Sequence, residues 1–266
     1  MAIDNFSYNY IETNIGQKIA YLKSGRGKKK LLLIHGNLAS SLWWKHTLES
    51  IPSGYEVYAP DLTGSGKTPE TGHRHTIEYF LSFIHDFLRA CEINEVYIAG
   101  HSMGGGIAQL FAIEHNDAVE ALALVDSMPM DGFHVLYKYG IEKLTALMND
   151  EKLLRKALFS VMPNIKDLDL FDHIVADAKR SSKQTFLEHP YTMHEANWSD
   201  KIGLIKCPTL ILHGMDDTFA LKEDCFRTAK AIKHCRLVFL ENCGHSPMLE
   251  TPREFNRLLF DFLDSV

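Results

Sequence analysis

The chain has 266 residues, of which 45% are hydrophobic and 23% are charged, and its formal net charge is −6. This composition is typical of a globular protein with a sizeable core, and it excludes a disordered chain. The acidic balance argues against nucleic-acid and anionic-membrane partners, so we expect neither.

No targeting or redox signal stands out in the sequence. Residues Met1 to Phe6 lack the basic and apolar regions of a signal peptide, and no apolar run approaches the length of a membrane span. We therefore expect a cytoplasmic protein. The cysteines lack the close pairing of a zinc or redox site and are expected to be reduced thiols: Cys91, Cys207, Cys225, Cys235 and Cys243.

The first part of the chain predicts a hairpin followed by buried strands. Residues Tyr8–Thr13 and Lys18–Lys23 alternate loosely around a short turn, which indicates an antiparallel pair. The short runs Leu31–Ile34 and Glu56–Ala59 predict two strands, the first apolar throughout as in a strand buried on both faces. A helix is expected between them, around Trp43–Ile51.

Strands and helices then alternate along most of the chain. The spacing of apolar residues predicts a helix over Thr76–Cys91, with one buried face. The remaining expected elements are the strand Val96–Ala99, the helix Ile107–His115, the strands Ala121–Val125, Thr209–Leu212 and Arg236–Leu240, and a final helix over Pro252–Phe262. This alternation predicts an α/β protein with a mostly parallel central sheet and helices on both faces.

One interval breaks the alternation. Between Met128 and Lys206 the sequence has only helical patches, at Tyr137–Met148, Glu151–Phe159 and Leu170–Lys179. We interpret 128–206 as a helical cap (lid) inserted into a core domain of residues 1–127 and 207–266. Because ligands bind at the carboxyl ends of parallel strands, a cap at that edge would shape a pocket.

The cap is rich in aromatic residues and methionines. Most such residues pack in the core of any helical segment, and we expect about a third of them to face the pocket. This favours a small or medium apolar substrate. The residues are Met128, Met130, Phe133, Tyr137, Tyr139, Met148, Phe159, Met162, Phe186, Tyr191, Met193 and Trp198.

A glycine-rich corner joins the strand Val96–Ala99 to the following helix. Gly100-His101-Ser102-Met103-Gly104 has the G-x-S-x-G form of a nucleophile elbow. Glycines two positions on either side leave room for a sharp turn that exposes the Ser102 hydroxyl. The N–H groups at the start of the next helix could stabilise an oxyanion.

A serine nucleophile needs a histidine base, and the base needs a carboxylate. Asp216 and Asp217 follow the strand Thr209–Leu212, and His245 follows the strand Arg236–Leu240. Both turns are expected at the same edge of the sheet as the elbow. The chain order Ser102, Asp217, His245 is the order that accompanies this elbow.

These motifs resemble those of the α/β-hydrolase superfamily, from His35 to Pro252. The matching segments are His35-Gly36-Asn37, Ala59 to Gly66 (A-P-D-x-x-G-x-G), Gly100 to Gly104, Gly214 to Asp217 and Gly244-His245, followed by Pro247, Glu250 and Pro252. The resemblance implies a serine-nucleophile, esterase-like enzyme with a helical cap. It also implies that Ser102 is the nucleophile, Asp217 the acid and His245 the base, with the backbone N–H groups of Asn37 and Met103 forming the oxyanion hole.

Several assignments have rivals. Asp216 is adjacent to Asp217, and Asp126 occupies a position that some relatives use for the acid. His101 is expected to pack locally, because the elbow directs it away from the Ser102 hydroxyl. The Asn37 side chain fits two roles equally, a donor to a substrate oxygen or a turn former.

The sequence gives little support for nucleotide binding or metal binding. Thr63 to Thr68 resembles the end of a phosphate-binding loop, but Asp61 replaces the first glycine and Pro69 follows at once. The histidines outside the motifs show no metal-ligand spacing. We therefore expect neither a cofactor nor a metal.

The sequence thus predicts a cofactor-independent carboxylesterase-like hydrolase that acts through an acyl-enzyme on a small-molecule ester. Serine rather than aspartate at position 102 excludes the alkyl-ester chemistry of relatives that open epoxides or displace halide. Lactones and the carbon–carbon bonds of diketones are related substrates for the same three residues. Two further alternatives are a hydroxynitrile-lyase-like enzyme and a ligand-sensing receptor with this fold.

Overall fold

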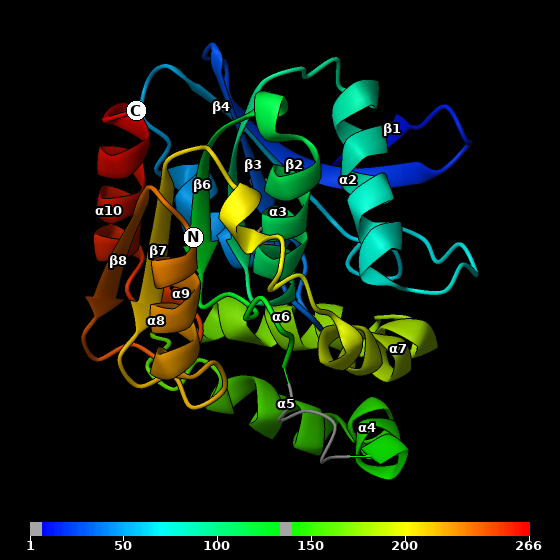
Figure 1. Ribbon diagram of the computed structural model, residues 1–266. Helices are drawn as coiled ribbons and strands as arrows, with labels where there is room; N and C mark the ends of the chain where they lie inside the picture. Colours follow the sequence, from blue (N-terminus) through cyan, green and yellow to red (C-terminus); the bar gives the residue numbers. More distant parts are fainter. Residues whose placement is uncertain (1–6, 134–139) are drawn as a thin grey trace.

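The computed structural model describes residues 7–133 and 140–266, and within them one sheet forms the centre of the molecule (Figure 1). Its strand order is β1-β2-β4-β3-β5-β6-β7-β8. The β1–β2 and β2–β4 pairs are antiparallel and the others are parallel, which confirms the predicted hairpin and the mostly parallel sheet. The strands are β1 (Asn9–Glu12), β2 (Lys18–Gly25), β3 (Lys29–Ile34), β4 (Tyr55–Pro60), β5 (Val96–His101), β6 (Val119–Val125), β7 (Thr209–Gly214) and β8 (Cys235–Leu240).

Helices cover both faces of this sheet. Helices α2 (Ile77–Ala90), α3 (Met103–Glu114) and α8 (Lys222–Ala231) share one buried cluster with β3 and β5. Helices α1 (Lys45–Glu49) and α10 (Pro252–Asp264) share the other, together with α9 (Pro247–Glu250). Three short 3-10 helices complete the core: η2 (Ser41–Trp44), η3 (Asn116–Ala118) and η5 (Ile202–Leu204). The sheet is therefore buried on both faces, which is why its central strands are apolar throughout.

Among the residues that the structure describes, four α-helices lie between β6 and β7 in the sequence. They lie together below the sheet in Figure 1 and are α4 (Gly140–Asn149), α5 (Glu151–Ser160), α6 (Leu168–Lys179) and α7 (Lys183–Glu195). The predicted patches match α5 and α6 closely, and α4 matches from its first described residue, Gly140. Of the predicted pocket residues, Tyr137 and Tyr139 lie outside the described residues. The sequence missed α7, because Pro190 in its interior is a helix breaker.

Two helix boundaries also differ from the expectation. Helix α3 begins at Met103 rather than Ile107, because burial overrides the low helix propensity of three consecutive glycines. The helix expected at Trp43–Ile51 is a 3-10 turn followed by the short α1. Across residues 7–133 and 140–266, no helix is both long enough and apolar enough to span a bilayer.

Candidate active site

Ser102 lies at the corner between β5 and α3. Its φ of 54° and ψ of −120° place it in a conformation that costs energy for a residue with a side chain. Neighbouring backbone holds it there, since Ser102 N donates to Val125 O at 3.0 Å and Met128 N donates to Ser102 O at 2.9 Å. A Cβ on Gly100 would lie 2.4 Å from the carbonyl oxygen of Gly104, so the turn requires glycine.

His245, in the loop after β8, contacts the Ser102 side chain. The Ser102 hydroxyl donates to His245 Nε2 at 3.0 Å, and His245 Nδ1–H donates to Asp217 Oδ2 at 2.7 Å. All three side chains are buried. The structure therefore brings the three predicted residues into one continuous chain of hydrogen bonds.

Asp217, rather than Asp216, is the aspartate that reaches His245. Its second oxygen accepts from Phe219 N at 2.7 Å and Ala220 N at 3.1 Å, whereas Asp216 is exposed. Burial opposes ionisation of Asp217, but His245 and these N–H groups outweigh it and lower its pKa to about 2. Burial likewise opposes the charged form of His245, yet Asp217 raises the pKa of His245 above its ordinary value.

Asp126, the rival acid, lies behind this pair at the end of β6. Its Oδ1 accepts from Gly214 N at 2.9 Å and lies 3.0 Å from His213 Nδ1. Burial and the nearby Asp217 charge raise the pKa of Asp126 well above its ordinary value, which favours the neutral carboxyl. Ligand-type atoms of Asp126, Asp217 and His245 lie within 4.8 Å of one another. The His245 Nδ1 proton already occupies the direction in which a metal would bind.

Glu250 holds the loop that carries His245. Its carboxylate accepts from the backbone N–H groups on both sides of the histidine, Gly244 at 3.1 Å and Ser246 at 3.0 Å, and from Asn164 N at 3.0 Å. The resemblance had marked Glu250 only as a family position. Its location five residues after His245, at the end of α9, was the signal for this role.

His101 and His35 both make local contacts. His101 Nε2–H donates to the carbonyl oxygen of His245 at 2.7 Å, and burial lowers the pKa of His101 well below its ordinary value. His35 Nδ1–H donates to Gly36 O at 2.8 Å, while its Nε2 accepts from Leu62 N at 2.9 Å. Neither ring contacts the Ser102 hydroxyl through these nitrogens.

The two predicted oxyanion donors lie on either side of Ser102. Met103 is the first residue of α3, so its N–H has no acceptor within the helix. Asn37 follows Gly36, and a Cβ on Gly36 would lie 2.9 Å from the Ser102 Cβ. The loop after β3 thus passes directly beside the serine.

A cavity of about 560 Å³ opens above Ser102 and His245. Its lining is mostly aliphatic and comes largely from α4 and α5. Of the described residues on the predicted pocket list, Phe186 and Met193 line it. Leucines are the most frequent residue type among the other lining residues: Leu38, Leu144, Leu147, Leu153, Leu154 and Leu158.

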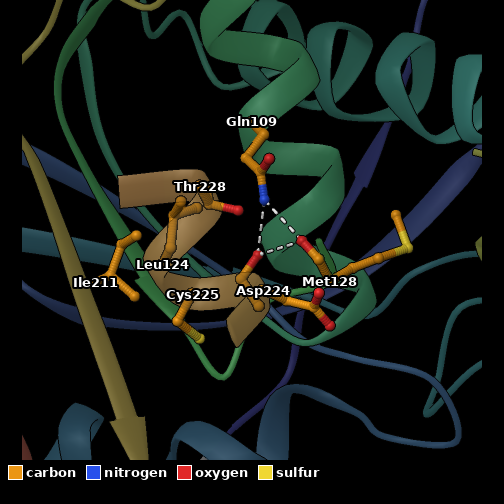
Figure 2. Close-up of a pocket in the computed structure, with 8 residues that line it drawn as sticks. Gln109, Leu124, Met128, Ile211, Asp224, Cys225 and Thr228 are labelled. Carbon is orange, nitrogen blue, oxygen red and sulfur yellow. Dashed lines mark hydrogen bonds between the residues drawn. The ribbon is translucent and has the colours of Figure 1, made fainter. Parts of the chain in front are cut away.

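A second cavity, between α3, α8 and the segment after β6, is far smaller. Gln109 Nε2 donates to Ser127 Oγ at 2.9 Å and to Met128 O at 2.8 Å. Figure 2 shows the Gln109 side chain pointing toward Met128 at this cavity. Its volume is about 10 Å³, which is room for a single water. Of these two cavities, the one above Ser102 is large enough for a substrate.

Comparisons with known proteins agree with this geometry. A family model described as "Alpha/beta hydrolase family" matches residues 31–258. The chain is 26% identical to 2-hydroxy-6-oxo-6-(2'-aminophenyl)hexa-2,4-dienoic acid hydrolase of Metapseudomonas resinovorans, over 93% of this chain and 88% of that protein. It is 25% identical to human monoacylglycerol lipase ABHD6, over 100% of this chain and 88% of that protein.

A solved structure is similar over nearly the whole chain. The crystal structure of a bacterial membrane phospholipase A superimposes with a TM-score of 0.85 and 26% identity. The match covers 98% of this chain and 86% of that one.

Proposed function

Because the chain belongs to the alpha/beta hydrolase family, we propose that it is a cofactor-independent serine hydrolase that cleaves small to medium apolar carboxylic esters. The observation that carries this proposal is the hydrogen-bonded chain from Ser102 through His245 to Asp217, at the floor of an apolar cavity. We also propose that residues 128–206 act as a cap that closes this cavity.

In the first half-reaction, Ser102 Oγ attacks the ester carbonyl carbon while His245 Nε2 takes the hydroxyl proton. The negative charge moves to the carbonyl oxygen, where the N–H groups of Asn37 and Met103 stabilise it. Asp217 stabilises the imidazolium. The tetrahedral intermediate then collapses, the bond to the alcohol oxygen breaks, and His245 protonates the leaving alcohol.

In the second half-reaction, neutral His245 takes a proton from water, and the resulting hydroxide attacks the acyl carbon. Collapse breaks the bond to Ser102 Oγ and returns the proton to the serine, releasing a carboxylic acid. The water supplies the hydroxyl group of the acid, and its other proton replaces the one that Ser102 gave to the alcohol, so no cofactor is needed.

The lining of the cavity supports an apolar acyl chain. Leucines, Phe186 and Met193 can bury alkyl groups, and similarity to a monoacylglycerol lipase points in the same direction. A second candidate substrate class is suggested by similarity to a hydrolase of a hydroxy-oxo-dienoic acid. The same three residues could cleave a carbon–carbon bond beside a ketone, or a lactone.

A substrate panel tests this proposal. We expect the wild-type protein to hydrolyse p-nitrophenyl esters of rising acyl length, with Ser102→Ala losing at least about 10⁴-fold in kcat. Monoacylglycerols, lactones and the oxo-dienoic acid extend the panel. Absence of turnover on every substrate, together with no fluorophosphonate labelling of Ser102, would overturn the proposal.

A further inference from the structure

A second chain of polar contacts runs from the cavity to the protein surface. Asn37 Oδ1, in the cavity wall, lies 2.9 Å from His189 Nδ1. His189 Nε2 lies 3.0 Å from His75 Nδ1, and His75 Nε2 lies 3.2 Å from Glu70 Oε1. Both histidines are fully buried, while the Glu70 side chain is partly exposed. The proposed mechanism uses none of these side chains.

The Asn37 end sets the direction of the first hydrogen bond, because Asn37 Oδ1 is the atom that lies against His189 Nδ1. Burial lowers the pKa of His189 well below its ordinary value, so its ring is neutral and carries one N–H. That N–H, at Nδ1, donates to the Asn37 amide oxygen, and His189 Nε2 therefore accepts from His75 Nδ1–H. His75 Nε2 lies beside Glu70 Oε1 at the surface end of this series of contacts. The direction of the first hydrogen bond leaves the Asn37 NH₂ group free to face the cavity.

Helix α7 is fixed to the core at several further points along this chain. His75 N donates to Glu188 Oε2 at 2.7 Å, and the Thr192 hydroxyl donates to His75 O. At the other end, the Ser182 hydroxyl donates to Glu70 Oε2 at 2.6 Å. These bonds fix α7 and the backbone of His75 against each other, and the ring contacts then hold the Asn37 amide before any ligand binds.

Building on the proposed function, we propose that the Asn37 NH₂ group binds an oxygen of the substrate beside its scissile carbonyl, and that His189, His75 and Glu70 position it. Asn37 is next to Gly36, which packs on Ser102, and Asn37 and Ser102 line the same cavity, so the amide is near the reacting carbon. The substrate class is then an ester that carries a hydroxyl or keto oxygen at C2 of its acyl chain. Asn37 is the specificity-determining residue, and the other three are positioning residues.

Binding to a protein that cannot turn over its substrate tests this assignment directly. In the Ser102→Ala background, Kd is measured by NMR titration for ethyl hexanoate and for each enantiomer of ethyl 2-hydroxyhexanoate. We expect one hydroxy ester to bind about three- to tenfold more tightly than the plain ester, the effect of one hydrogen bond. Asn37→Asp should abolish the preference, because an oxygen replaces the NH₂ group.

Variants of His189 separate positioning from folding. His189→Leu should reduce the preference to about one, because the Asn37 oxygen loses its donor. His189→Asn should retain it, since Asn Nδ2 occupies nearly the same position as His Nδ1 and can donate in its place. His173→Leu, at an exposed histidine of α6, is the matched control and should leave the preference unchanged. Melting temperatures show whether each variant is folded.

Equal affinity for the plain and hydroxy esters, or a preference that survives Asn37→Asp, overturns this inference. So does loss of the preference in His189→Asn when the melting temperature is unchanged. These Kd ratios do not depend on turnover. Failure of the proposed function is a separate observation, namely no ester hydrolysis and no fluorophosphonate labelling in the wild-type protein.

Discussion

Two chains of polar contacts end at the same cavity, and different parts of the fold build them. Ser102, His245 and Asp217 all lie in loops at the carboxyl ends of parallel strands, so the register of the sheet sets their spacing. The chain from Asn37 to Glu70 passes through His189 of α7, so it depends on how that helix docks on the core. The difference suggests that the sheet supplies the chemistry and the docked helix supplies the selectivity.

The largest effect is expected at Asp217, the acid in the hydrogen-bonded series Ser102–His245–Asp217. Asp217→Asn should lower kcat by about 10⁴-fold for plain and hydroxy esters alike, because the amide favours the wrong tautomer of His245. Asp216→Asn is the matched control and should cost less than about threefold, since that side chain is exposed and surface changes have small effects. Steady-state kinetics on both variants measures this, and the reverse ranking would transfer the acid role to Asp216.

The sequence was sufficient to predict that Ser102, His245 and Asp217 lie together, because each of them follows the end of a strand. Each residue follows a short apolar run at a turn, and parallel strands bring such turns to one edge. The family motifs then distinguished Asp217 from Asp216, which strand patterns alone could not do. The same reasoning predicted the hairpin, the sheet and most helices, since their signal is apolar periodicity.

The contacts that link Asn37 to Glu70 could not be predicted, because no local sequence pattern indicates which residues contact each other. Because Pro190 lies inside α7, the sequence pattern does not predict this helix. The contact between His189 and Asn37 joins residues 152 positions apart in the sequence. His75 precedes α2 as one polar residue in a loop. Only the packing of α7 on the core brings these side chains together, and that packing depends on the complete set of tertiary contacts.

The pH dependence of kcat/KM should be set by His245, in the hydrogen-bonded series Ser102–His245–Asp217. His245 must be neutral to accept the Ser102 proton, and its pKa lies above the ordinary value of 6.5. We therefore expect kcat/KM to fall about tenfold per pH unit on the acid side, with a midpoint above that value. His101 and His189 have lowered pKa values and stay neutral throughout this range.

Asp217→Asn is the control for that profile. Without the carboxylate, burial should dominate and move the midpoint of the acid limb to lower pH. A midpoint that stayed in place in this variant would show that another group controls the acid limb.

A smaller effect is expected where Glu250 holds the His245 loop. Glu250→Gln presents an NH₂ group to backbone N–H donors, so we expect about a tenfold loss of kcat and a loss of about 1–3 kcal/mol in the free energy of unfolding. The ratio between hydroxy and plain esters should not change, because the Asn37 chain is untouched. Glu254→Gln, at an exposed site on α10, is the control for stability. A change in the ester ratio would show that the two chains are coupled.

The smallest effect on activity is expected at Asp126, behind the first chain. Asp126→Asn keeps an oxygen for Gly214 N and resembles the neutral carboxyl that the raised pKa favours, so it should change kcat by less than about threefold. Its effect on stability depends on pH. In the wild-type protein the unfolded state ionises at Asp126 near its ordinary pKa of 3.8, whereas the raised pKa keeps the proton on the folded state to higher pH. The free energy of unfolding therefore falls as pH rises above 3.8. Asparagine does not titrate, so the stability of the variant relative to wild type should rise from pH 4 towards neutral pH, as urea denaturation at several pH values would show. A loss of kcat as large as that of Asp217→Asn would instead make Asp126 the acid.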